Sequence, residues 1–193
     1  MNAKPADASR GRLQFLLVAV VFAGPLILAA WMYYSGSAFA PKSGTNSGVL
    51  LQPIVSLTEI LPESPIHAEA GDLWILLYSN DEACGDPCLE TLYRLRQSRL
   101  MLGNDMIRVV RVFLHGDSAL DTVRLEEQHA GLITTTDKDL GELLERKRPP
   151  EMPAGGVYLI DPLGNLVMYF SPDLDPKDMV SDIEHLLRLS HIG

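Results

Sequence analysis

The sequence predicts an α/β protein, a central sheet flanked by helices, preceded by one membrane-spanning helix. An uncharged apolar run of 20 residues occupies positions 15–34, about the length that a helix needs to cross a bilayer core. Beyond it, short runs rich in branched and aromatic residues alternate with segments whose leucines recur at helical spacing. That alternation is typical of a sheet with helices on both faces.

Length and charge indicate how many domains the chain has and which partners it is expected to lack. The 193 residues suit one folded domain and an appendage. The net charge is -9, but residues 1–34 carry three basic residues against one acidic residue, so the remainder carries -11. An acidic body of this kind repels phosphate backbones, and we therefore expect no nucleic-acid partner.

The apolar run divides the chain into four expected parts. These are a cytoplasmic tail over 1–12, a transmembrane anchor over 13–34, a flexible linker over 35–48 and a folded domain over 49–193. The linker is rich in serine, glycine and other small residues, as flexible tethers are. We expect a single-pass membrane protein.

A cleaved signal peptide is the alternative to an anchor. Ala38-Phe39-Ala40 has the small-residue pattern of a cleavage site. The apolar run, however, exceeds the roughly 7–15 residues of a signal peptide, and Pro41 directly follows the bond that would be cut. These features favour the uncleaved anchor.

Flanking charges predict the orientation. Arg10 and Arg12 precede the span and only Lys42 closely follows it, so the positive-inside bias leaves the N-terminus in the cytoplasm. For a bacterial source, the anchor then lies in the inner (cytoplasmic) membrane and the domain in the oxidising periplasm.

The elements of the domain follow from hydrophobic periodicity and turn residues. The prolines within 49–71 indicate an irregular wrap or an edge strand. Beyond them we expect strands, helices and one hairpin. We expect strands over 72–79 and 106–114, a short extended piece over 134–136, and a hairpin formed by 156–161 and 166–170. We expect helices from Cys88 to Gly103, over 121–129 and 137–147, and from Asp175 onward. This order matches the thioredoxin topology.

Both cysteines of the chain lie where the first strand meets the first helix, in the motif CGDPC. Pro87 suits the first turn of a helix, so Cys84 is expected in the preceding loop and Cys88 in that first turn. A helix N-terminus lowers the pKa of a nearby thiol, whereas Asp86, between the cysteines, opposes this effect.

Three interpretations of the pair remain open at this point. It can be a local stabilising disulfide, a site of thiol–disulfide exchange, or a pair of soft copper(I) ligands that needs a third. So short a loop restricts the unfolded chain little, so a disulfide would stabilise weakly. The junction position, with no other cysteine in the chain, favours a functional pair.

The segments LWILLYSNDEACGDPCLETLYRLRQ, MIRVVRVFL and GGVYLIDPLGNLVMYF resemble the Sco-type proteins, over roughly residues 49–193. The CxxxC spacing and the VYLIDPxG hairpin are the most specific pieces. Members of that family are membrane-anchored, thioredoxin-fold copper chaperones and thiol–disulfide reductases. They help to build the dinuclear copper centre of cytochrome c oxidase subunit II. The resemblance implies oxidase subunit II or a copper chaperone as protein partner, and copper as a metal.

The sequence departs from that family at a copper ligand. The family's histidine, eight positions before the aspartate of the hairpin strand, corresponds here to Pro153. Met152, a soft thioether, and His115, at the end of the second strand, are the substitutes that the sequence offers to Cys84 and Cys88. The remaining histidines, at positions 67, 129, 185 and 191, are assigned no role.

Pro153 has a second interpretation. In thioredoxin folds a cis-proline ahead of the third main strand faces the cysteine pair, and Met152-Pro153 occupies a comparable place. We therefore count Cys84, Cys88 and Pro153 as candidate catalytic residues. The function expected is thiol–disulfide exchange in oxidase assembly. Copper(I) carriage and a non-catalytic docking factor are the alternatives.

Overall fold

The computed structural model describes residues 8–34, 46–57, 66, 70–118 and 120–190. The chain divides into two compact units, Met1–Thr45 and Asn46–Gly193. Some sequence-based expectations fall outside the described residues. These are the first seven residues of the tail, linker residues 35–45 with the cleavage pattern and Lys42, and the histidines at 67 and 191.

The first unit contains one long helix, α1 (Ala8–Tyr34). Its most apolar window, Gln14–Trp31, has a mean hydropathy of 2.2, and none of it is buried. In length and composition it can serve as a single-pass membrane anchor. The helix begins before the apolar run and includes Arg10 and Arg12, which were expected in the tail; arginine is a good helix former, so the first turns extend beyond the apolar stretch.

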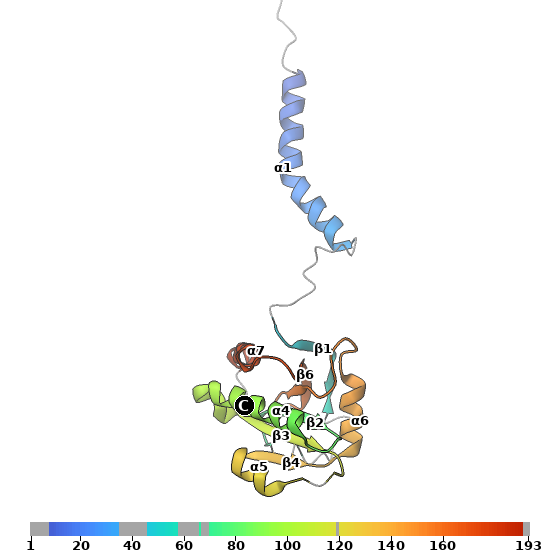
Figure 1. Cartoon of the computed structure of the whole chain (residues 1–193). Coiled ribbons are helices and arrows are strands. Elements are labelled where there is room, and N and C mark those ends of the chain that lie inside the picture. Colours follow the sequence, from blue (N-terminus) through green and yellow to red (C-terminus); the bar gives the residue numbers. More distant parts are fainter. Residues whose placement is uncertain (1–7, 35–45, 58–65, 67–69, 119, 191–193) are drawn as a thin grey trace, which may run out of the picture. The chain divides into compact units, whose positions relative to one another are not determined.

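The second unit is built on one six-stranded mixed sheet (Figure 1). Its spatial order is β1-β6-β5-β2-β3-β4. The neighbours β2, β3 and β4 are parallel, and the pairs β1/β6, β6/β5 and β5/β2 are antiparallel. The strands are β1 (Val49–Ser56), β2 (Trp74–Asn80), β3 (Val109–His115), β4 (Leu132–Thr135), β5 (Val157–Ile160) and β6 (Asn165–Phe170).

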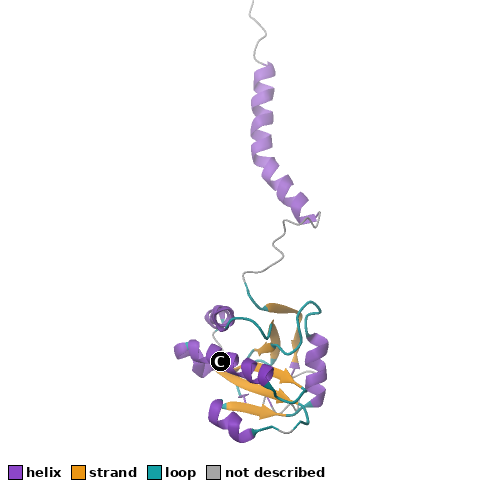
Figure 2. Ribbon diagram, in the orientation of Figure 1, coloured by secondary structure: helices purple, strands orange, loops and turns teal. Residues whose placement is uncertain are grey.

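Helices cover both faces of this sheet (Figure 2). Side chains alternate along a strand, so Leu76 of β2 packs on one face and Leu77 on the other. We call the two sides the α4 face, which α4, α5 and α7 cover, and the α6 face, which α6 covers. The helices are α4 (Asp86–Met101), α5 (Thr122–Gln128), α6 (Lys138–Lys147) and α7 (Pro176–Leu189).

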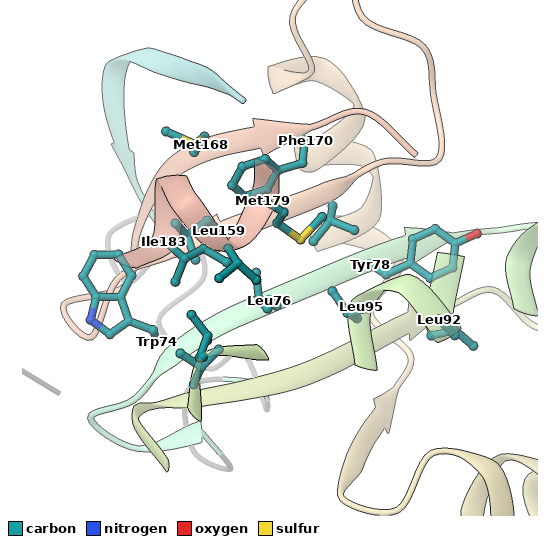
Figure 3. Packing of buried hydrophobic residues seen from close by; sticks show 14 of the residues in the cluster. Trp74, Leu76, Tyr78, Leu92, Leu95, Leu159, Met168, Phe170, Met179 and Ile183 are labelled. Atoms are coloured by element: carbon teal, nitrogen blue, oxygen red, sulfur yellow. The ribbon is translucent and has the colours of Figure 1, made fainter. Parts of the chain in front are cut away.

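The larger apolar cluster lies on the α4 face (Figure 3). Leu92 and Leu95 of α4 and Ile183 of α7 project onto it, and each is at most 1% exposed. At roughly 1.5–3 kcal/mol for each fully buried leucine or isoleucine, this contact holds α4, and with it the cysteine motif, against β2. The expected α/β architecture is therefore confirmed.

Local chemistry explains most of the element boundaries. Asp121, Asp137 and Asp175 each accept a hydrogen bond from a backbone N–H of the helix that they precede, as N-cap residues do. The N-terminal segment forms edge strand β1, with its register irregularity between Leu50 and Val55. β3 begins at Val109, three residues later than expected, because a 3₁₀ helix over Gly103–Arg108 takes up the start of that run.

Two glycines offer a paired test of the packing. A Cβ at Gly156 would lie 2.1 Å from the Phe170 carbonyl oxygen, whereas a Cβ at Gly141, in α6, would make only ordinary contacts. We expect Gly156→Ala to lower the free energy of unfolding by at least about 1–3 kcal/mol through overpacking. Gly141→Ala should raise it by about 1 kcal/mol, because alanine favours the helix. Urea unfolding of both variants checks this, and equal effects would contradict it.

Candidate functional site

The cysteine motif lies where β2 ends and α4 begins. The Gly116 N–H, just after β3, donates to the Asn80 carbonyl oxygen at 3.2 Å, and the Asn80 side-chain amide donates to the Glu82 carbonyl oxygen at 3.1 Å. A Cβ at Gly116 would approach the Asp81 carbonyl oxygen to 2.5 Å. The loop that carries Cys84 is therefore held by a backbone-to-backbone contact that only glycine permits.

Cys84 and Cys88 form a disulfide, with their Cα atoms 5.1 Å apart. Cys84 lies in the loop and is half-buried, whereas Cys88 lies in the first turn of α4 and is only 4% exposed. This is the placement that the sequence predicted. Cys84, in the loop, is therefore the more accessible of the two cysteines.

The start of α4 supplies partial positive charge beside the disulfide. Gly85 is the N-cap residue and makes no side-chain capping bond, and Pro87 lies in the first turn. The first N–H groups of a helix have no partner within the helix, so their dipoles favour a thiolate at this position. Asp86, an exposed carboxylate in the same turn, acts in the opposite direction.

A polar chain fastens this first turn to the sheet. The Tyr78 hydroxyl, at the end of a buried side chain, is hydrogen-bonded to Thr91. The Thr91 hydroxyl in turn donates to the Pro87 carbonyl oxygen at 3.0 Å. The Tyr78 ring also stacks on Phe113, with ring centroids 5.3 Å apart. Burial raises the pKa of Tyr78, so the phenol stays neutral and remains able to donate.

Sequence reasoning missed this chain and the contact at Gly116. In the sequence, Tyr78 lies within an apolar strand pattern and Thr91 within a helical pattern, and neither pattern indicates a hydrogen bond between the two residues. The available signal was the tyrosine itself, because a buried phenol needs a hydrogen-bond partner. Gly116 carried a similar signal, since a glycine at a strand end often marks close backbone approach.

Met152 does not join the cysteines. Its side chain packs against the cluster on the α6 face, whereas Cys84 and Cys88 belong to the cluster on the α4 face. This packing does not support Met152 as a substitute for the missing copper ligand, and that role stays a prediction.

The position of His115 agrees better than that of Met152 with the role of a substitute copper ligand. It pairs in register with Asn80 at the end of β3, and its ring packs against Phe113, 5.7 Å away, on the α4 face. Its Nδ1 atom is 2.7 Å from the Gly116 carbonyl oxygen, an arrangement in which Nδ1 donates and Nε2 keeps the lone pair. Among the described residues, however, no three His, Cys, Asp or Glu side chains are grouped as a metal site requires.

Pro153 does not follow a cis bond. The cis peptide bond of the described residues is Gln52–Pro53, in β1. Pro153 instead belongs to a turn whose backbone is fixed by side chains: the Tyr169 hydroxyl donates to the Pro153 carbonyl oxygen at 2.6 Å and accepts from the Gly156 N–H at 2.9 Å. The prediction of a cis-proline at this position was wrong, because Pro153 lies four residues before β5 and Gly156 directly precedes it.

Two cavities flank the loop, and acidic residues line both. One, of about 350 Å³, lies on the α6 side and includes Asp81, Glu82 and Glu145. The other, of about 520 Å³, includes His115, Asp81, Asp117, Asp137 and Glu142, with Lys138 as its basic residue. Negative charge around the loop disfavours thiolate formation and repels anionic partners.

The polar chain below the disulfide can be tested by a double-mutant cycle. Thr91→Val leaves the buried Tyr78 hydroxyl without its partner, so we expect it to cost about 1–3 kcal/mol of stability. Adding Tyr78→Phe removes the stranded hydroxyl, so the double variant should cost less than the sum of the two single changes. Denaturant unfolding measures these values. Ser98→Ala, which removes a hydroxyl that donates to the Arg94 carbonyl oxygen within the same helix, is the matched control. Additivity of Thr91→Val and Tyr78→Phe would contradict the coupling.

Comparison with solved structures identifies the fold. The solution structure of apo Sco1 from Thermus thermophilus has a TM-score of 0.53 at 19% identity, covering 75% of this chain and 99% of that one. Yeast Sco1 gives 0.51 at 20% identity, and Arabidopsis thaliana ScoI with copper bound gives 0.50 at 21%; each comparison covers 64% of this chain and 89% of the other. At these identities the likeness shows a shared thioredoxin-like fold.

Family comparison covers both units of the chain. No curated protein matches the sequence. The model of a transmembrane-like N-terminal domain matches residues 5–36, and the model of a transmembrane-like, thioredoxin-like C-terminal domain matches residues 74–190. The second match alone covers more than half of the 193 residues. The chain therefore belongs to the transmembrane-like family with a thioredoxin-like C-terminal domain.

Proposed function

We propose that this protein is a membrane-anchored thiol–disulfide exchange factor that acts through Cys84 and Cys88 during assembly of the copper centre of cytochrome c oxidase. The observation that carries the proposal is the disulfide at the start of α4, with one half-exposed and one buried cysteine. Exchange needs one sulfur that a partner can reach and a second that resolves the intermediate. The resemblance to Sco-type proteins supplies the process.

The chemistry proposed is a two-electron exchange. In the reduced protein the Cys84 thiolate attacks a disulfide of the partner, forms a mixed disulfide and releases one partner thiolate. The Cys88 thiolate then attacks the sulfur of Cys84 and releases the second partner thiolate. The partner's disulfide is thereby reduced to two thiols, and Cys84–Cys88 is oxidised. A dithiol reductant of the same compartment must return the pair to the reduced form.

The proposed location follows from the anchor and the chemistry together. Arg10 and Arg12 before the span favour a cytoplasmic N-terminus, so the domain would face the periplasm of a bacterial cell. Disulfides persist in that compartment. Oxidase subunit II or a copper chaperone is the partner we propose.

Trapping the intermediate tests the proposal and the order of attack. In Cys88→Ser the mixed disulfide on Cys84 cannot be resolved, so we expect it to accumulate and to be visible as a reducible adduct on a non-reducing gel. Cys84→Ser should give little or no adduct, because Cys88 is buried. The double variant is the control. Adducts on Cys88 alone would reverse the order, and failure of both single variants to form any adduct would overturn the exchange function.

Copper(I) carriage is the second candidate, and His115 is the observation that favours it. Reduction of the disulfide would provide two thiolates, and the ring of His115 lies on the same face of the sheet at the neighbouring strand end. Two sulfurs and an imidazole suit copper(I). In this proposal copper is cargo, which the protein receives and passes to subunit II.

Anaerobic titration of the reduced full-length protein with copper(I) tests this candidate. Competition with a chelator of moderate affinity should show one equivalent bound, and His115→Ala should weaken binding by about 10–100-fold if the imidazole is a ligand. His185→Ala, in α7, is the matched control. Failure to compete with the chelator removes copper(I) carriage as a candidate function.

A different experiment tests the docking alternative. If the Cys84→Ser, Cys88→Ser double variant restored oxidase activity to a strain that lacks this protein, the protein would act as a docking factor that needs no thiols.

A further inference from the structure

Exposed apolar side chains gather at the end of α4 that lies away from the cysteine motif. Leu100 and Met101, in the last turn of α4, are 47% and 43% exposed, and Ile107, in the 3₁₀ helix that follows, is 70% exposed. Leu189, the last residue of α7, is 68% exposed. We call these four residues the apolar tip. Single exposed apolar residues are common on protein surfaces, whereas a group of them indicates a surface that meets something other than water.

Three segments meet at the apolar tip. Arg108, the last residue of the 3₁₀ helix, donates from Nη1 to the Leu187 carbonyl oxygen at 3.3 Å and from Nη2 to the Ser190 carbonyl oxygen at 3.1 Å, both at the end of α7. The Arg99 Nε atom of α4 donates to the Val109 carbonyl oxygen at 2.6 Å, directly after the 3₁₀ helix. Helices α4 and α7 also pack side by side (Figure 1). The last turns of the two helices and the 3₁₀ helix therefore form one surface.

This surface is basic, although the domain is acidic. Residues 94–108 carry four arginines against one aspartate, whereas residues 35–193 together carry a net charge of -11. The aspartate, Asp105, is 3.6 Å from the Nη1 atom of Arg108. Three further arginines of this segment therefore carry its positive charge.

Two arginines beside the apolar tip are available to a partner. Arg96 is half-buried one turn before Leu100, and Arg188 is exposed in the last turn of α7. Neither takes part in the ion pairs of the described part of the chain. Glu184, one turn before Arg188, is half-buried. Guanidinium groups next to exposed apolar side chains suit the phosphates of lipid headgroups, because the apolar groups can enter the interface beneath them.

The cysteine end of the domain carries the opposite charge. Asp81, Glu82 and Glu145 line one cavity beside the loop, and Asp117 and Glu142 are among the residues that line the other. Helix α4 has 16 residues, so its two ends are about 24 Å apart. An anionic surface attracts the arginines at one end and repels the carboxylates at the other. Such a surface therefore favours one orientation of the domain.

A lipid surface is also within reach of the domain. Residues 35–45 join the anchor helix to the folded unit, and eleven residues span at most about 40 Å when fully extended. We propose that the apolar tip, together with Arg96 and Arg188, docks on the anionic lipid headgroups of the membrane that holds α1. Docking presents the cysteine motif away from the lipid, towards partners in the same compartment. The inference concerns orientation and needs no thiol chemistry, so the oxidised protein serves for its test.

Fluorescence quenching in nanodiscs that each hold one full-length, disulfide-bonded chain tests this inference. The discs contain phosphatidylcholine and phosphatidylglycerol in equal amounts, with brominated acyl chains that quench a nearby tryptophan. Trp31→Phe removes the tryptophan of α1, and Ile107→Trp then reports on the apolar tip. Val123→Trp, at a residue in the first turn of α5 that is 66% exposed, is the matched control. Trp74 stays as a buried background in every variant.

We expect quenching at position 107 to be at least about threefold stronger than at position 123, and to disappear in phosphatidylcholine alone or at high salt, because headgroup charge and its screening control the contact. Equal quenching at the two positions would overturn the proposal. So would quenching that persists in phosphatidylcholine alone. A second copy or another protein as the true occupant of the apolar tip would leave position 107 unquenched in single-chain discs, and this result would also overturn it.

Substitutions of the arginines locate the contact. Arg96→Gln and Arg188→Gln should each lower the ratio of docked to undocked protein about fivefold, the factor that one arginine contributes near an anionic membrane. Arg146→Gln, at an exposed arginine of α6, is the matched control and should leave the ratio unchanged. Leu189→Ser removes apolar area without changing charge, and it should also weaken docking if an arginine variant fails to fold. Undiminished quenching in a folded Arg96→Gln, Arg188→Gln double variant or in Leu189→Ser would contradict the assignment.

Discussion

The contact between the end of β2 and the residue after β3 fixes the position of the cysteine motif. Parallel pairing of β2 with β3 brings Asn80 and His115 to the same edge of the sheet, and the Gly116 N–H then donates to the Asn80 carbonyl oxygen. The chain enters the loop by passing against Gly116, where a Cβ would collide with the backbone of Asp81. The loop that carries Cys84 and leads into α4 begins at this contact.

The α4 face adds a second constraint, because it decides which sulfur is accessible. Leu92 and Leu95 hold α4 against the sheet, and the chain from Tyr78 through Thr91 holds its first turn. Cys88 lies in that turn and is therefore buried with it, whereas Cys84 precedes the helix and keeps partial exposure. The difference between the two cysteines arises from the packing of the helix and not from the cysteines themselves.

Periodicity and turn chemistry predicted the architecture, because each strand and helix carries its own apolar pattern. The boundaries of α5, α6 and α7 follow from aspartates that cap them locally. Features that join distant segments could not be predicted in this way: Met152 packs on the α6 face, and the turn at Pro153 is held by the hydroxyl of Tyr169 from β6, and neither contact follows from a local pattern. The burial of Arg111, which is 2% exposed, could not be predicted either, because RVVRVF indicates a strand but does not show what lies opposite each arginine.

Charge along α4 links the disulfide to the buried arginine and sets two requirements against each other. Asp86 in the first turn and Arg99 in the last both complement the helix dipole and stabilise the helix. The same arrangement places a carboxylate beside Cys84, where it disfavours a thiolate, and a guanidinium near Arg111, where it adds to an uncompensated positive charge. Helix stability is therefore gained at the expense of both neighbouring groups.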